Sequence, residues 1–264
     1  MRQMLSMKIE PERIHKVVRM MRQKVRKYRG KQEIQIVAAK FYQKYRRYED
    51  ALQTYRRIEN DKTKGRYLVE FGRAVQNDSL YDFALQAYNE ARERFPNSKS
   101  LLPAYLGAAK SNLELARQKN DQEYAQKSVR MINTVRDKYP KHPQLPNLLL
   151  LEGDIYREFF FDLDKAIQIY ESLAATYRKN ATLVTNSILR ASECYIKKGD
   201  LGKAEETLQP LLADDTAKEQ ADALLLNSRI LFYQTDYDGA AEKINEVLAL
   251  QGFSGSSTND ALNL

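Results

Sequence analysis

Few side chains in this chain are of the types that perform catalysis, and none are spaced to act together. The two histidines, His15 and His142, lie 127 positions apart, and neither has a metal-ligand or nucleophile partner at a recognisable spacing. The single cysteine, Cys194, cannot form an internal disulfide or build a zinc site alone. Its helical surroundings predict a packed thiol. We therefore expect no catalytic residues, no metal and no cofactor, and a protein that is not an enzyme.

Two further patterns resemble functional sites but do not indicate one. Gly252 and Gly255 stand among serines, as in a phosphate-binding loop, but no lysine follows them and no predicted strand precedes them. The adjacent carboxylates Glu205 and Glu206 are typical of a solvated helix end. The chemistry that remains is binding, by polar side chains that recur along helices.

The composition indicates helices as the elements that position these side chains. Apolar residues make up 43% of the 264 positions, yet there are only 10 glycines and 7 prolines, so tight turns are few. Runs of alternating β-branched residues are nearly absent, which favours an all-α fold. No run of 18 apolar residues is present, and the first residues lack the apolar core of a secretory signal. We expect a cytoplasmic location, or a periplasmic or envelope-associated one if the chain is a fragment.

The stretch 66–96 shows the organisation most clearly. Large and small residues recur there on one face of each of two predicted helices, around a turn at 77–79. They are Leu68, Phe71, Gly72 and Val75, then Tyr81, Ala84, Tyr88 and Ala91, before a closing Pro96. We expect Gly72 and Ala84 to lie where the two helices cross closely, because a larger side chain would push the helices apart.

The same pattern recurs six times. The small residues of the two helices are 12 apart in the pairs Ala39/Ala51, Gly72/Ala84, Ser192/Ala204 and Ser228/Ala240, 19 apart in Ala109/Ser128 and 13 apart in Gly153/Ala166. This order of large, small and aromatic residues resembles the tetratricopeptide repeat, although Leu68 and Val75 replace the usual Trp and aromatic. The linkers RFPNSKSLLPAYL and KYPKHPQLPNLLLLEGDIY are similar to those of bacterial envelope members of that family.

The resemblance implies a right-handed α-α superhelical solenoid of about six helix pairs over residues 31–251. It also implies a non-enzymatic scaffold that binds a protein or peptide in a concave groove lined by the first helix of each pair. The residue after each small position is then Lys40, Arg73, Lys110, Asp154, Glu193 and Arg229. This line is basic at first and acidic later, so it would orient an acidic segment. Ordinary surface charge is the alternative explanation. The predicted partner-binding residues are Lys40, Lys44, Arg73, Asn77, Lys110, Phe232 and Tyr233.

The two ends differ from the repeats. Residues 1–66 hold 20 Lys and Arg against 7 Asp and Glu. A helix from Pro11 carries the stripe Ile14, Val18, Met21 and Val25, which favours residues 1–30 as a cap docked on the first repeat. The alternative is a basic arm that binds nucleic acid or an anionic surface. Residues 252–264 are predicted to be a loop and the start of a further helix, so we expect a truncated array.

Overall fold

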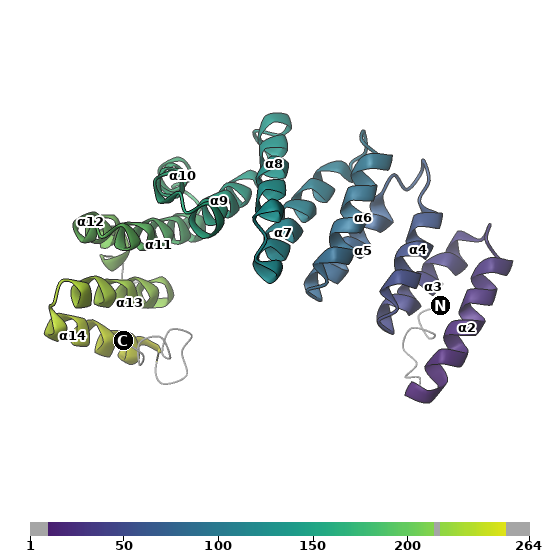
Figure 1. The fold of residues 1–264 in the computed structure, drawn as a ribbon, viewed down its shortest axis with the longest axis horizontal. Helices are drawn as coiled ribbons and strands as arrows, with labels where there is room; N and C mark the ends of the chain where they lie inside the picture. The colour runs from purple at the N-terminus through teal and green to yellow at the C-terminus, as the bar shows by residue number, and fades with distance from the viewer. Residues whose placement is uncertain (1–9, 214–216, 252–264) are drawn as a thin grey trace. The chain divides into compact units, whose positions relative to one another are not determined.

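The computed structural model describes residues 10–213 and 217–251, and within them every regular element is a helix. The all-α class is therefore confirmed, and the segment predicted as a loop and helix start at 252–264 lies outside the described residues. The elements (Figure 1) are α2 (Pro11–Lys27), α3 (Gln32–Lys44), α4 (Tyr48–Ile58), α5 (Arg66–Asn77), α6 (Tyr81–Arg94), α7 (Leu101–Lys119), α8 (Gln122–Lys138), α9 (Leu145–Ile155), η1 (Tyr156–Phe160), α10 (Leu163–Thr176), α11 (Ala181–Lys198), α12 (Leu201–Leu212), α13 (Ala217–Tyr233) and α14 (Tyr237–Gln251).

The chain divides into two compact units, Met1–Lys138 (unit 1) and Tyr139–Leu264 (unit 2). Unit 1 holds α2 and the helix pairs α3/α4, α5/α6 and α7/α8. Unit 2 holds the pairs α9/α10, α11/α12 and α13/α14. The described residues thus contain the six helix pairs that the spacing predicts.

The basic helix α2 is fixed to the first helix pair of unit 1. Its residues Val18, Met21 and Val25 are buried in the same core as that pair. The buried amide of Gln35 in α3 donates to the carbonyl oxygen of Val25 at 2.8 Å and to that of Tyr28 at 3.1 Å. Those carbonyls belong to the end of α2, where backbone acceptors have no partner within the helix. The apolar stripe therefore docks while most basic side chains stay in solvent.

Tyrosine rings explain the small residues of the first helices. A Cβ built on Gly72 would lie 2.8 Å from Cε1 of Tyr88, and one built on Gly107 would lie 2.2 Å from Cζ of the same ring. In unit 2 the ring of Tyr170 stands in the same relation to Gly153, at 2.4 Å. The sequence predicts close helix crossing at Gly72. It does not single out Gly107, because the small residue assigned to the third pair is Ala109. The structure shows that a tyrosine fills the space. It comes from the second helix of the same pair at Gly72 and Gly153, and from the second helix of the preceding pair at Gly107.

In each of the six pairs, the turn between the two helices contains one residue with positive φ. The second helix begins two positions after this residue. These residues are Arg46, Ser79, Asn120, Phe161, Gly199 and Thr235. In five pairs the backbone N–H of the residue after the positive-φ residue donates to the carbonyl five positions earlier, as the N–H of Leu80 does to the carbonyl of Val75 at 2.8 Å. This pattern satisfies the free carbonyls at the end of the first helix and favours glycine at the left-handed position. Of the six turn residues, only Gly199 is a glycine.

The fourth pair contains one extra residue, and a π-helix absorbs it. The 13-residue gap between its small residues is one longer than in the regular pairs. Here η1 ends α9, and the N–H of Asp162 donates to Tyr156 O, six positions back, at 3.0 Å. A single π turn is the usual way in which a helix accommodates an inserted residue. In the third pair the longer gap instead extends the helices α7 and α8, which have 19 and 17 residues.

Candidate binding surface

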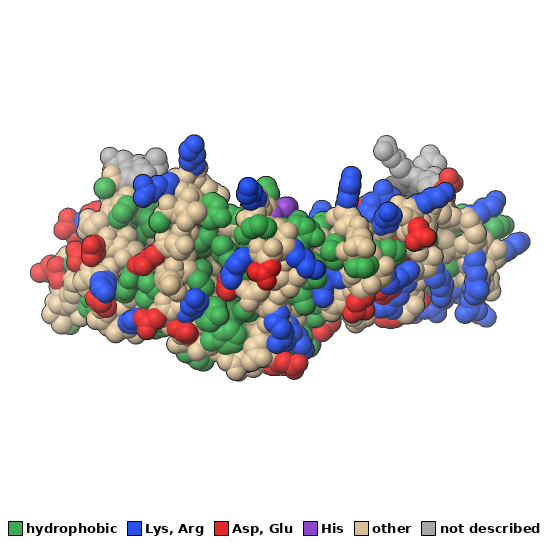
Figure 2. All heavy atoms as spheres, turned by 90° about the horizontal axis from the view of Figure 1, so that it is seen from above, with side chains coloured by type: hydrophobic (Ala, Val, Ile, Leu, Met, Phe, Trp, Pro, Cys, Tyr) green, Lys and Arg blue, Asp and Glu red, His purple; other side chains and the backbone are tan. Residues whose placement is uncertain are grey.

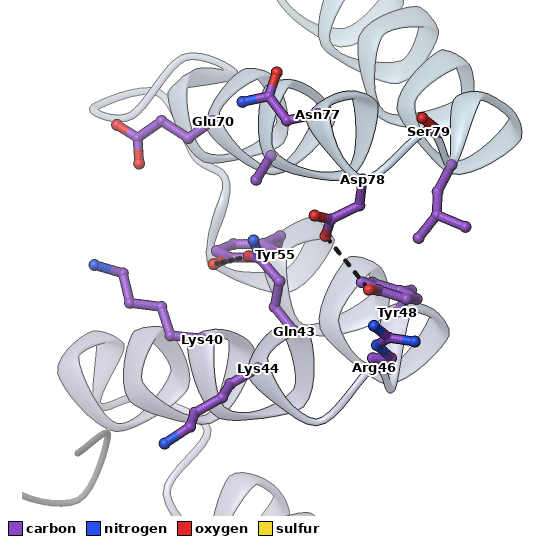
Figure 3. A pocket seen from close by; sticks show the side chains of 12 residues that line it. Lys40, Gln43, Lys44, Arg46, Tyr48, Tyr55, Glu70, Asn77, Asp78 and Ser79 are labelled. Carbon is purple, nitrogen blue, oxygen red and sulfur yellow. Dashed lines mark hydrogen bonds between the residues drawn. The ribbon is translucent and has the colours of Figure 1, made fainter. Parts of the chain in front are cut away.

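A groove of about 930 Å³ opens in unit 1 between the first helix pair and α5 (Figure 3). Its lining comes from α3, α4, α5 and the turns that follow α3 and α5. The lining residues are Lys40, Gln43, Lys44, Arg46, Tyr48, Tyr55, Glu70, Ala74, Asn77, Asp78, Ser79 and Leu80. We call this the α3–α5 groove.

Three of the predicted residues, Lys40, Lys44 and Asn77, line this groove together. All three are exposed, and the Lys40 ammonium has no ion-pair partner among the described residues. Lys40 and Glu70 extend near one end of the groove (Figure 3). These side chains reach the groove because α3 and α5, the first helices of neighbouring pairs, both face it.

Two long hydrogen bonds shape the walls of the groove. Tyr55 donates to Oε1 of Gln43, and Tyr48 donates to Oδ2 of Asp78, each at 3.4 Å. Burial and the neighbouring carboxylate of Asp78 raise the pKa of Tyr48. Sequence reasoning missed Tyr48 and Asp78 because it considered only the first helix of each pair. The positive-φ turn between α5 and α6, which starts at the end of α5, places Asp78 at the groove.

The charge of the groove is mixed. Lys40, Lys44 and Arg46 contribute positive charge, and Glu70 and Asp78 contribute negative charge. A ligand in it therefore meets separate cationic and anionic points, and an acidic segment gains only where its carboxylates lie opposite the cations.

Arg73 lies in a neighbouring pocket of about 630 Å³ rather than in the α3–α5 groove. Glu70 lines both. The cations of this pocket are Lys62, Lys64, Arg66, Arg73 and Lys99. Lys110 is exposed on α7 and lines neither site. The structure therefore brings Lys40, Lys44 and Asn77 together and places Arg73 and Lys110 elsewhere in unit 1.

The expectation of an acidic line in unit 2 is wrong. Asp154 is only 6% exposed; it accepts a hydrogen bond from the Tyr170 hydroxyl at 2.8 Å and lies 2.9 Å from Nε of Arg190. Glu193 forms an ion pair with Arg157. Asp154 is therefore buried away from any ligand, and the more exposed Glu193 is already paired with a guanidinium group.

Phe232 and Tyr233 lie at the end of α13 in unit 2, where they are 41% and 53% exposed. The ring of Phe232 meets those of Tyr233 and Tyr237 edge to face, at centroid distances of 6.0 and 5.4 Å. These three rings form a small exposed aromatic cluster on unit 2. The groove that holds Lys40 belongs to unit 1.

The cysteine and the two histidines, the first residues considered for catalysis, lie in different surroundings. Cys194 is buried, as predicted, and burial raises the pKa of its thiol to about 11. His15 is exposed, and Nδ1 of His142 accepts the N–H of Gln144 at 3.1 Å within a turn. Among the described residues there is no group of three or more His, Cys, Asp or Glu placed to hold a metal ion. No helix in that part of the chain is long and apolar enough to cross a membrane.

The fold and the grooves define an all-α protein of repeated helix pairs. Residues 161–227 match the family model described as tetratricopeptide repeat. Among solved structures, PilW, a widely conserved type IV pilus biogenesis factor, is similar with a TM-score of 0.60 and 16% identity over 88% of this chain and 98% of that one. The C-terminal part of a repeat protein from Cytophaga hutchinsonii has the same TM-score and identity over 95% of each chain.

A third similar structure is YrrB, described as a tetratricopeptide protein with an unusual peptide-binding site; its TM-score is 0.51 and its identity 16%, over 77% of this chain and 94% of YrrB. No curated protein sequence matches significantly. The resemblance of the sequence to tetratricopeptide repeats is thus confirmed, and the fold is that of tetratricopeptide proteins.

Proposed function

We propose that this protein is a non-enzymatic scaffold that holds an extended segment of a partner protein in the α3–α5 groove. Tetratricopeptide folds in general serve as scaffolds for protein–protein interaction. The observation that carries the proposal is the convergence of Lys40, Lys44 and Asn77 on one open groove of about 930 Å³. A groove of this size between helices, with separate cationic, anionic and amide groups, suits a peptide backbone with a few charged side chains.

The preferred segment has carboxylates opposite Lys40 and Lys44 and backbone groups that hydrogen-bond to Asn77. Exposed ion pairs contribute only up to about 1 kcal/mol each, so we expect binding in the micromolar range that weakens with salt. Arg73 and Lys110 lie outside the groove, so they serve such a ligand only where it extends past the groove.

A photo-crosslinking amino acid at position 43, inside the groove, tests the proposal in cells of the native source. It should capture a protein segment, and mass spectrometry would locate that segment. The same amino acid at Gln86, an exposed position on α6 outside the groove lining, should not capture it.

Charge reversal provides the second arm. The double substitution Lys40→Glu and Lys44→Glu should abolish the crosslink. The charge-matched pair Lys16→Glu and Lys27→Glu, on the exposed face of α2, should leave it intact. Equal crosslinking from position 43 in the parent and in the groove variant would disprove the proposal.

A further inference from the structure

A smaller pocket, of about 240 Å³, lies in unit 1 between α2 and the first helix pair. Three of its lining side chains are arginines, and Figure 2 shows how strongly Lys and Arg gather over the N-terminal helices of this unit. The lining residues are Arg22, Val25, Arg26, Tyr42, Asp50, Gln53, Thr54 and Arg57. We call it the arginine pocket. It is separate from the α3–α5 groove, since no residue lines both.

The arginine pocket keeps positive charge after its internal pairing. Arg22 donates through Nε and Nη2 to the two oxygens of Asp50, at 3.1 and 2.7 Å, and Arg47 also reaches this carboxylate at 3.3 Å. Asp50 is the only carboxylate among the described residues that line the pocket. Arg26 and Arg57 are exposed and have no ion-pair partner in the described part of the chain. Two guanidinium groups are therefore available to a ligand.

Tyr42 adds an unsatisfied donor. Its side chain is 1% exposed, and its hydroxyl is buried without a hydrogen-bond partner in the described protein. Native proteins satisfy nearly all buried polar groups, so such a hydroxyl calls for an explanation. Burial raises the pKa of Tyr42 to about 12, so the hydroxyl stays protonated well into the alkaline range. The residue thus offers a hydrogen to an acceptor that the fold does not itself supply.

We propose that the arginine pocket binds a small phosphate-type oxyanion. Arg26 and Arg57 supply charge-assisted hydrogen bonds through planar guanidinium groups, whose geometry suits phosphate oxygens. The hydroxyl of Tyr42 donates to one oxygen of the anion. The site lies where α2 meets α4, so an anion there would also join the N-terminal helix to the first repeat.

Thermal unfolding of the whole chain tests this binding, with inorganic phosphate compared with potassium chloride at equal ionic strength. A ligand that binds only the folded state raises the melting temperature with concentration. Tyr42→Phe removes only the unpartnered hydroxyl, so its stability without phosphate should equal or exceed that of the parent. Its affinity for phosphate should fall about tenfold, the typical effect of losing one hydrogen bond to a charged group.

Two arginine variants complete the design. Arg57→Gln should also weaken phosphate binding about tenfold, because it removes a guanidinium without breaking an ion pair. Arg13→Gln, which removes the same charge from an exposed position on α2 outside the pocket, should retain the parent's affinity. The proposal is overturned if phosphate stabilises the parent no more than chloride does, or if Tyr42→Phe binds phosphate as tightly as the parent.

The source of the phosphate group is decided by sedimentation with vesicles of phosphatidic acid in phosphatidylcholine. If the pocket takes a lipid headgroup, Tyr42→Phe should reduce co-sedimentation relative to the parent. If it takes a dissolved phosphate, the two proteins should sediment equally while their affinities for inorganic phosphate differ. Either result, together with the phosphate titration, supports the same pocket chemistry.

Discussion

The hydroxyl of Tyr170 donates a hydrogen bond to Oδ1 of Asp154 at 2.8 Å inside unit 2, where both residues are buried. Nε of Arg190 lies 2.9 Å from the same oxygen, and Arg157 approaches it at 3.6 Å. The burial of Tyr170 and the charge of Asp154 raise the pKa of the tyrosine. These contacts join α10 and α11 to α9, so Asp154 is the centre of a charged network within the helical core.

We expect Asp154→Asn to destabilise unit 2 by about 3 kcal/mol, because it removes the buried carboxylate that pairs with the partly buried guanidinium of Arg190. Urea unfolding followed by circular dichroism measures the change. Lys203→Gln is the control, because it breaks an exposed ion pair with Asp200 (3.8 Å) in the same unit and should cost less than about 1 kcal/mol. Equal effects of the two substitutions would contradict this role of Asp154.

Gly107 is required by the ring of Tyr88. A Cβ at this position would lie 2.2 Å from Cζ of Tyr88, so Gly107→Ala should cost about 1–3 kcal/mol through overpacking. A Cβ on Gly202, in α12, would meet no atom within 4 Å, and Gly202→Ala should stabilise by about 0.5–1 kcal/mol. Chemical denaturation of the two variants should therefore give opposite signs. The expectation fails if Gly107→Ala is as stable as the parent.

The left-handed turn residue of the last pair is Thr235, with a φ of 67°, where a β-branched residue is strained. Thr235→Gly should stabilise the protein by about 1 kcal/mol. The reciprocal change, Gly199→Thr, should destabilise it by a similar amount, since Gly199 has φ 78° and open space around it. Melting temperatures that move the same way in both variants would show that backbone strain does not set the stability of these turns.

Two adjacent methionines in α2 lie on different faces of the helix, one buried and one exposed. Met21 is 6% exposed and belongs to the core of unit 1, whereas Met20 is 47% exposed. We expect Met21→Ala to cost about 2–5 kcal/mol and Met20→Ala to change stability by less than about 0.5 kcal/mol. The measurement is the urea midpoint of the whole chain. If Met21→Ala is as mild as Met20→Ala, α2 does not stabilise the first repeat.

Buried tyrosines predict a loss of stability at high pH. Burial raises the pKa of Tyr42 and of Tyr88 to about 12, whereas an unfolded tyrosine titrates near about 10. Because the folded pKa lies above the unfolded one, the stabilisation is fully present below about pH 10 and is lost as the pH rises toward about 12.

Urea unfolding at a series of alkaline pH values checks this dependence. The double variant Tyr42→Phe and Tyr88→Phe should lose less stability over the same range, because two of the groups responsible are gone. A parallel decline in parent and variant would place the alkaline transition elsewhere.

The sequence by itself determined the helices, their pairing and the location of the small residues, because each depends on spacings within about 20 positions. The regular gap between Gly72 and Ala84 was enough to place two helices, and the gap of 13 between Gly153 and Ala166 already showed a fourth pair one residue longer. The helical surroundings of Cys194 also sufficed to predict a buried thiol.

Only the tertiary structure decided which charges are paired and which are available. Asp154 meets Arg190 across 36 positions of sequence, and Arg22 meets Asp50 across 28. The spacing of residues along one helix does not predict which side chains of different helices come into contact, since these contacts depend on how the helices pack. For the same reason the sequence predicted Lys40 as a groove residue but could not show that Asp154 is neutralised or that the hydroxyl of Tyr42 lacks a partner in the described protein.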